Sequence, residues 1–222
     1  MRRLRRSSRA LRSGIGSENP GRIVEAGYDQ VAQQYANLES EGREWPRMRR
    51  LRELLTEIPD GGTVLDVGCG NGIPAMRAIQ ESHKGVGVDI SGVQIDLARR
   101  NVPGGHFIHG GIMDVDFPPD TFDAIVAFYS VEHVSREQHA ELFMRFLRWL
   151  KPGGRFMFTL EPYDEPDRTD EWLGVPMFFS AFDPDTTAQL LADVGFAVTD
   201  RRIETQLEDE REIEYMWWTA TK

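Results

Sequence analysis

The sequence of 222 residues contains a single cysteine, Cys69, and no long apolar run. One cysteine excludes an internal disulfide framework and is typical of a protein from the reducing cytoplasm. No window approaches the roughly 18–20 consecutive apolar residues of a membrane-spanning helix, and no apolar segment of a signal peptide follows the basic N-terminus. Because 40% of the residues are nevertheless hydrophobic, we expect a folded, cytoplasmic protein without a membrane partner.

Positive charge is scarce outside the N-terminus. Residues 1–12 carry six arginines and no acid, and the remaining 20 basic and 36 acidic side chains leave the rest of the chain at −16. A body this acidic repels phosphate backbones, so a nucleic-acid partner is not expected. We interpret residues 1–20 as a basic, flexible leader; contact with an anionic partner or a transit-peptide role are the alternatives.

Strand and helix patterns alternate along the middle of the chain. Apolar, β-rich runs predict strands at 63–67, 85–90, 106–109, 122–129 and 155–160, and helices at 73–81, 92–100 and 136–150 lie between them. This alternation, with short glycine-bearing connections, predicts a parallel sheet with helices on both faces. Two helices, from about residue 23 and over 46–57, precede it. A long loop at 161–182, a helix at 184–194 and a hairpin of strands at 196–205 and 212–221 follow.

A glycine-rich turn follows the first predicted strand, over Gly68–Gly72 (GCGNG). Its glycines permit a tight turn and let a ligand approach the backbone without a clash with Cβ, and the start of the following helix suits a negative group. Asp66 lies at the end of that strand. Asp89 ends the second strand, 21 residues after Gly68, where an acid can accept hydrogen bonds from a ribose diol. These residues fit either a nicotinamide dinucleotide or S-adenosylmethionine.

Four segments resemble motifs of the class I S-adenosylmethionine-dependent methyltransferases, specifically the bacterial small-molecule type of methyltransferase domain. VLDVGCGNG resembles their first motif, GVGVDIS the second, FPPDTFDAIVAFYSVEHV the fourth and LKPGGRFMFTL their fifth-strand segment. A dehydrogenase would more often show GxGxxG, whereas Ile73 stands at the sixth position here. The resemblance implies an α/β fold: a doubly wound, mostly parallel, Rossmann-like seven-stranded sheet with its last strand antiparallel, in one domain over 21–222.

The resemblance further implies that S-adenosylmethionine is the cofactor. Asp89 would bind its ribose, and the glycine turn would pack on its methionine part. YDQVAQQYANL resembles the lid helix of the family, so residues 21–60 are expected to form a helical lid; its tyrosines either close over the carboxylate end of the cofactor or pack in the core. The expected cofactor-binding residues are Tyr28, Tyr35, Asp66, Gly68, Cys69, Gly70, Asn71, Asp89, Ile90, Gln94, Ile112, Met113, Phe128 and Ser130.

Two positions depart from the family pattern. Gly111 stands where the family usually has the aspartate that receives the adenine amino group. Either backbone atoms around Ile112 and Met113 hold the adenine, or Asp114 takes that role from a shifted loop. Ala181 stands where one bacterial branch commonly has a histidine; if that histidine serves catalysis, this protein has lost it or has changed its substrate.

The candidate catalytic residues follow the fourth strand. His133 has a side chain whose pKa near neutrality suits a general base, with local packing as the alternative. Glu132 beside it is a second base, an anchor for a cationic substrate, or a solvated loop acid. Tyr129, Glu161 and Tyr163 could line the acceptor site. The other histidines (His83, His106, His109 and His139) are too scattered for a metal site, so none is expected.

The aromatic residues of the insertion at 161–182 predict either an apolar lid or a satellite core. An apolar lid favours a lipophilic or aromatic acceptor, so the sequence predicts methyl transfer to an O, N or C atom of such a small metabolite, in specialised metabolism, by a monomer or homodimer. Gly111 and Ala181 keep two alternatives open: an enzyme that binds the cofactor without methyl transfer, or a regulatory binding protein. A nicotinamide dehydrogenase is a more distant one.

Overall fold

The structure is a computed structural model that describes residues 19–40, 46–208 and 211–222. Its centre is a seven-stranded sheet in the order β3-β2-β1-β4-β5-β9-β8. Strand β9 pairs antiparallel with both β5 and β8, and the other strand pairs of this sheet are parallel. The expected doubly wound, mostly parallel sheet is therefore confirmed. The strands are β1 (Thr63–Val67), β2 (Lys84–Asp89), β3 (His106–His109), β4 (Phe122–Ala127), β5 (Leu150–Leu160), β8 (Ala197–Glu208) and β9 (Arg211–Thr221).

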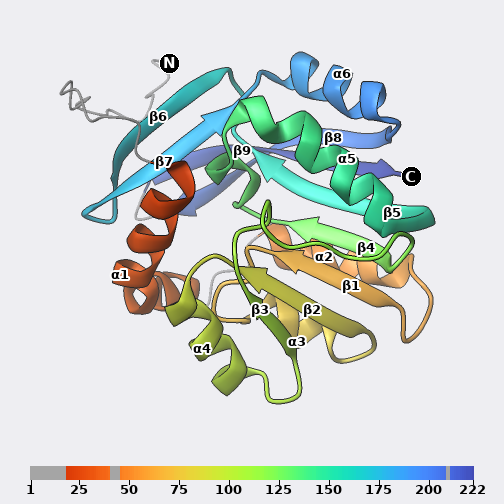
Figure 1. Cartoon of the computed structure of the whole chain (residues 1–222), viewed down its shortest axis with the longest axis horizontal. Coiled ribbons are helices and arrows are strands. Elements are labelled where there is room, and N and C mark those ends of the chain that lie inside the picture. The colour runs from red at the N-terminus through yellow and green to blue at the C-terminus, as the bar shows by residue number, and fades with distance from the viewer. Residues whose placement is uncertain (1–18, 41–45, 209–210) are drawn as a thin grey trace.

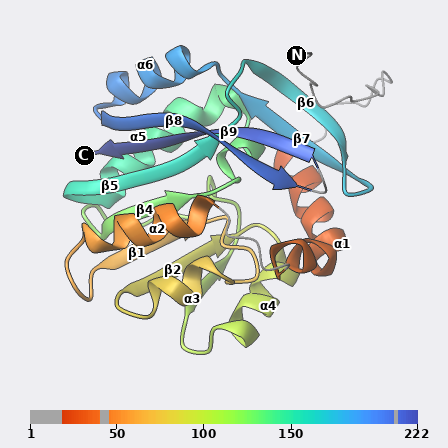
Figure 2. The same cartoon turned by 180° about the vertical axis from the view of Figure 1, so that it is seen from behind.

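Helices cover both faces of this sheet (Figure 1). One core cluster lies beneath α2, α3 and α4, and another beneath α5 and α6. Figure 1 shows α5 and α6 in front of the sheet, and Figure 2 shows α2 and α3 in front from behind. The helices are α1 (Pro20–Ser40), α2 (Pro46–Thr56), α3 (Ala75–Ile79), α4 (Gly92–Asn101), α5 (His139–Trp149) and α6 (Pro184–Val194), with 3-10 turns η1 (Val131–His133) and η2 (Arg136–Gln138).

Burial explains why the central elements form where their patterns predicted. Strand β4 is an almost continuous apolar run, as expected for a strand covered on both faces of a parallel sheet. Helix α5 buries one stripe against the sheet, with Leu142, Phe143, Phe146 and Trp149 all inaccessible to solvent. These elements fix the β4 end that carries the candidate catalytic turn.

The prediction of a long loop at 161–182 is wrong, because most of this segment forms a two-stranded hairpin of β6 (Glu165–Trp172) and β7 (Val175–Ala181). The acidic β6 has residues that are depleted in strands, so its pattern did not indicate one. Arg168 pairs with Glu165 and with Asp170 at 2.7 Å each and offsets that charge. The turn places Leu173 and Gly174 at positive φ, as in a type I′ turn, although leucine is not a usual residue there.

Two further elements differ in length from their predictions. Helix α3 has five residues rather than the nine predicted, which removes the basis for an anion site at its first turn. The final hairpin is longer than predicted, and β5 pairs only with residues 216–221 of β9. The outer part of the hairpin therefore extends past the C-terminal end of β5.

Helix α1 and the β6–β7 hairpin lie at the ends toward which β1, β2 and β4 point (Figure 1). This is the edge where open α/β sheets bind their ligands. The proposed leader falls mainly on residues 1–18, which lie outside the described residues. Among the described residues, no helix combines the length and the apolar character needed to cross a membrane.

Candidate active site

A cavity of about 520 Å³ opens at this edge of the sheet, between α1 and the C-terminal ends of β1, β2 and β4. Its volume suits a ligand of cofactor size. The expected cofactor-binding residues all line it except Asn71, and His133 also lines it.

A side chain would meet different surroundings at each of the three glycines of the turn. A Cβ on Gly68 would lie 2.5 Å from Cβ of Ser130, so this glycine lets β1 and β4 end side by side. A Cβ on Gly72 would lie 3.4 Å from Cα of Ala98 and press on α4. A Cβ on Gly70 would meet nothing within 4 Å. Only Gly70 thus leaves open space toward the cavity, as a backbone that cradles a ligand requires.

Asp89 is held in place at the end of β2 by backbone donors. Its Oδ2 accepts a hydrogen bond from the N–H of Gly70 at 2.8 Å, and its Oδ1 accepts one from the N–H of Ser91 at 2.8 Å. Burial raises the pKa of this carboxyl to about 6, and the two N–H donors oppose that shift. Each oxygen retains acceptor capacity for a ligand hydroxyl.

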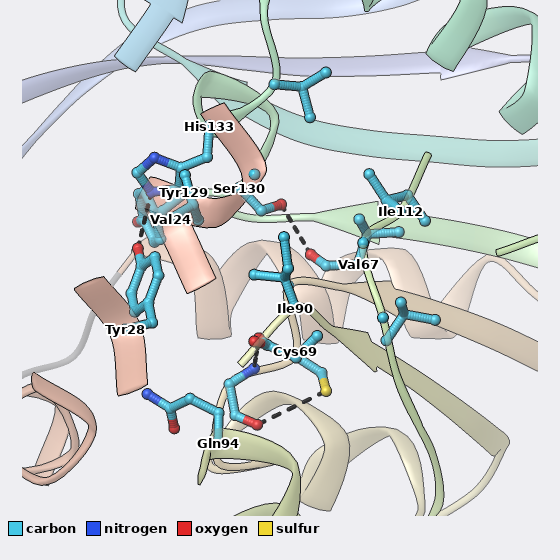
Figure 3. A pocket seen from close by; sticks show the side chains of 18 of the residues that line it. Val24, Tyr28, Val67, Cys69, Ile90, Gln94, Ile112, Tyr129, Ser130 and His133 are labelled. Atoms are coloured by element: carbon cyan, nitrogen blue, oxygen red, sulfur yellow. Dashed lines mark hydrogen bonds between the residues drawn. The ribbon is translucent and has the colours of Figure 1, made fainter. Parts of the chain in front are cut away.

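Gln94 supplies the clearest sign that the cavity takes a polar ligand. Its side chain is 1% exposed, it lines the cavity, and neither its Nε2 nor its Oε1 has a hydrogen-bond partner among the described residues. A buried amide without partners is costly, and a bound ligand with both donors and acceptors would satisfy it. Figure 3 shows Gln94 near Cys69 of the glycine turn.

The carboxylate of Asp114 lies beside Gly111, the position that departs from the family pattern. A Cβ on Gly111 would lie 2.7 Å from Oδ2 of Asp114, so that carboxylate occupies the place where a side chain at 111 would project. Asp114, Ile112 and Met113 all line the cavity. Of the two alternatives from the sequence, a carboxylate supplied by a shifted loop has the better geometric support.

Hydrogen bonds at both ring nitrogens fix the tautomer of His133. Its Nδ1 lies 2.7 Å from the carbonyl oxygen of Phe178, which can only accept, so Nδ1 carries the proton. When the ring is neutral, Nε2 presents its lone pair and accepts the hydroxyl proton of Tyr28 at 2.9 Å (Figure 3). This places Tyr28 beside the candidate base.

Tyr129 is a strained residue in the cavity wall. It has φ of 54°, which is unusual for a bulky residue, and its N–H donates to Oγ1 of Thr159 at 2.6 Å. Its hydroxyl donates to Oε1 of Gln206 at 2.6 Å, from the outer part of the β8–β9 hairpin. Backbone strain of this kind concentrates at functional sites.

Sequence reasoning missed Arg47 and Gln206. Arg47 is 8% exposed and is the one arginine or lysine among the described residues that line the cavity. Its neighbour Arg50 anchors α2 to β8 through Asp200 and Glu204. The helical pattern of α2 indicated only a core face, and no motif marked either missed residue.

Several predicted site residues lie elsewhere. The side chain of Asn71 accepts from the N–H of Ile73 at 2.9 Å and stabilises the turn. Glu132 is buried but does not line the cavity, because successive residues of a 3-10 turn point about a third of a turn apart. Glu161 and Tyr163 also lie outside the cavity wall. Among the described residues, no three His, Cys, Asp or Glu side chains form a group that could hold a metal ion.

The aromatic insertion packs against α1 instead of lining the cavity. Phe178, Phe179 and Met177 form a small core with Val24, and Trp172 packs against it. None of these insertion side chains is in the cavity wall. The satellite-core alternative therefore describes them better than an apolar lid over the ligand.

Comparisons with known proteins agree with this geometry. The family model of a methyltransferase domain matches residues 64–154. Demethylmenaquinone methyltransferase of Symbiobacterium thermophilum is 30% identical over 141 residues, which are 59% of this chain and 55% of the relative. The chain spans less than two thirds of the length of the curated relatives it matches first.

Two solved structures have similar folds. The [4+2]-cyclase SpnF matches with a TM-score of 0.69 at 22% identity, over 95% of this chain and 99% of that one. The 1,6-didemethyltoxoflavin-N1-methyltransferase of Burkholderia thailandensis, with bound 1,6-didemethyltoxoflavin and S-adenosylhomocysteine, matches with a TM-score of 0.64 at 19% identity, over 96% and 93%. At these identities the likeness concerns the fold, and the family match adds the motifs. Residues 64–154 therefore match the methyltransferase-domain family, and the chain as a whole has the fold of S-adenosylmethionine-dependent methyltransferases.

Proposed function

We propose that this protein transfers the methyl group of S-adenosylmethionine to an O, N or C atom of a small molecule. The observation that carries the proposal is that one cavity holds both a nucleotide cradle, at Gly70, Asp89 and Gln94, and a base chain, at Tyr28 and His133. The cradle residues come from the ends of β1 and β2 and from α4, whereas the base chain comes from α1 and η1. A cofactor and an acceptor could therefore meet between them.

The residues at the β2 end fit S-adenosylmethionine. Asp89 and Gln94 would bind the ribose hydroxyls, and Ile90, Ile112 and Met113 would flank the adenine, with Asp114 accepting from its amino group. The turn around Gly70 would contact the methionine part, and Arg47 could hold its carboxylate. When bound, the cofactor supplies an electrophilic methyl group on a sulfonium.

The acceptor proton would leave through Tyr28 and His133. Tyr28 would accept, at its hydroxyl oxygen, the proton that the acceptor atom loses when it takes up the methyl group that the cofactor would supply. Tyr28 passes its own proton to Nε2 of His133, which it already contacts. The imidazolium that results is stabilised at Nδ1 by the carbonyl of Phe178.

The acceptor end of the cavity is more polar than the sequence predicted. The lipophilic or aromatic acceptor was inferred from insertion side chains that pack outside the cavity. The wall at this end instead carries Tyr35, Tyr129, Ser135 and Gln138 besides the base chain. We therefore propose a polar acceptor whose nucleophilic atom carries an exchangeable proton.

A product assay tests the proposal. The full chain is incubated with S-adenosylmethionine and a panel of small amines, phenols and hydroxy acids, and S-adenosylhomocysteine is measured by mass spectrometry. Acceptor-dependent formation of S-adenosylhomocysteine is expected. If the cofactor binds but no product forms across the panel, the alternative of cofactor binding without methyl transfer would be favoured.

A further inference from the structure

Three consecutive residues of α1 contact three different parts of the molecule. Successive residues of an α-helix point about 100° apart, so Gly27, Tyr28 and Asp29 span more than half of the helix circumference. Gly27 faces β7, where an added Cβ would lie 2.8 Å from Cε of Met177 and 3.0 Å from the carbonyl oxygen of Pro176. Tyr28 contacts His133 after β4, and Asp29 contacts the start of α4. Contacts in three directions within one turn therefore fix the position of α1 against the rest of the molecule.

Asp29 of α1 forms hydrogen bonds with the segment that follows Asp89, the acid proposed to bind the ribose. Its Oδ1 accepts the hydroxyl proton of Ser91 at 2.6 Å and the N–H of Val93 at 3.3 Å. Ser91 has no exposed surface, and it is also the N-cap of α4, because its Oγ accepts the N–H of Gln94 at 3.1 Å. Since α4 already has its own cap, Asp29 is a second acceptor supplied from a different element.

Ser91 connects Asp29 to the cofactor side without a gap. The N–H of Ser91 donates to Asp89 at 2.8 Å, and Asp89 accepts from Gly70 at 2.8 Å. One continuous series of hydrogen bonds therefore runs from the glycine turn to α1. The next residue of α1 toward the N-terminus, Tyr28, continues it to the base.

We propose that Asp29 is a positioning residue: its contact with Ser91 seats α1 on the cofactor-binding loop and thereby brings Tyr28 to His133. The inference rests on the proposed function, because it assigns the two ends of this connection to cofactor and acceptor. A ligand held by Asp89 and Gln94 would stabilise the loop to which Asp29 hydrogen-bonds. Cofactor binding would then favour the position of α1 in which Tyr28 contacts His133, before the acceptor reacts.

Hydrogen exchange of the full chain with and without S-adenosylhomocysteine tests this directly. In the wild type, the ligand is expected to slow amide exchange across residues 23–36 of α1 about tenfold, and to change the NMR signal of the His133 imidazole. Asp29→Ala is expected to bind the ligand but to lose both responses. Asp29→Asn should restore them, because its amide oxygen can accept from Ser91 and Val93.

Gln30→Ala is the matched control, since Gln30 is the exposed neighbour and, among the described residues, its side chain bonds only to the carbonyl of Ala26 in α1. It should behave as the wild type. Unchanged protection of α1 and an unchanged His133 response in Asp29→Ala would overturn the inference. If Asp29→Ala does not fold, the wild type decides: ligand binding without protection of α1 would also overturn it. A wild type that does not bind S-adenosylhomocysteine would contradict the proposed function itself.

Discussion

The two ends of the cavity are built in different ways. Apart from Arg47 of α2, the cofactor end comes from one continuous stretch, β1 to the loop after β3, and adjacent strands bring its residues together in register. The acceptor end is assembled from α1, η1, β7 and the β8–β9 hairpin, which are far apart in sequence. Such a division lets one end stay constant while the other changes. We expect changes at the two ends to affect different measurements.

The largest expected effect concerns the acceptor end. His133→Asn keeps a donor for the carbonyl of Phe178 but removes the basic Nε2, so turnover with an accepted substrate should fall about 10²- to 10⁴-fold. The affinity for S-adenosylhomocysteine should stay within about twofold, because the cradle is untouched. Steady-state kinetics and calorimetry measure the two quantities. His106→Asn, on exposed surface, is the control, and an equal loss of cofactor affinity in His133→Asn would contradict the division.

A change in the glycine turn should act on stability. Gly68→Ala places a Cβ at positive φ and 2.5 Å from Ser130, so we expect a loss of roughly 3–5 kcal/mol in the free energy of unfolding. Gly61→Ala is a matched control with φ of 70° and no neighbour within 4 Å, and it should cost about 1 kcal/mol. Denaturant unfolding distinguishes them. Similar losses in both variants would mean that the contact with Ser130 has no role.

The acidity of Asp89 predicts a pH dependence at the cofactor end. Its pKa of about 6 means that the carboxylate, which accepts hydroxyl protons best, is lost as the pH falls below 6. Affinity for S-adenosylhomocysteine should drop by up to about tenfold per pH unit there. The same raised pKa makes the contribution of Asp89 to stability less favourable as the pH rises from about 4 to about 6. Calorimetry from pH 5 to 8 would refute this if the affinity did not change.

The smallest expected effect concerns the adenine. Asp114 is exposed, so Asp114→Ala should weaken S-adenosylhomocysteine binding only about three- to tenfold. The inosine analogue, which lacks the amino group, should bind wild type and variant alike. Asp96→Ala, at the exposed surface of α4, serves as the control. Equal weakening of both ligands by Asp114→Ala would show that the carboxylate does not contact the amino group.

The cofactor end could be predicted from the sequence because its signals are local. Three glycines, Asp66 and Asp89 occupy fixed places relative to two strands, and parallel pairing leaves little freedom in where they meet. Asn71 is the exception, since an amide in a turn can stabilise the turn itself. The place of Asp114 needed the structure, because the sequence does not fix the path of the loop after β3.

The acceptor end could be predicted only in part. His133 follows a recognisable strand, but its partners Tyr28 and Phe178 are 105 and 45 residues away, and no local pattern encodes such contacts. The aromatic insertion was predicted by composition, which does not tell a cavity wall from a satellite core. Glu132 shows the same limit, because the short turn after β4 decides which of two neighbouring side chains reaches the cavity.

The most direct test of the central claim is calorimetric titration of the full chain with S-adenosylmethionine and S-adenosylhomocysteine, beside Asp89→Ala. We expect micromolar binding to the wild type and a loss of about a hundredfold or more in the variant, because Asp89 is proposed to be the main hydrogen-bond acceptor for the ribose. No binding at millimolar ligand, or binding that Asp89→Ala leaves intact, would contradict it.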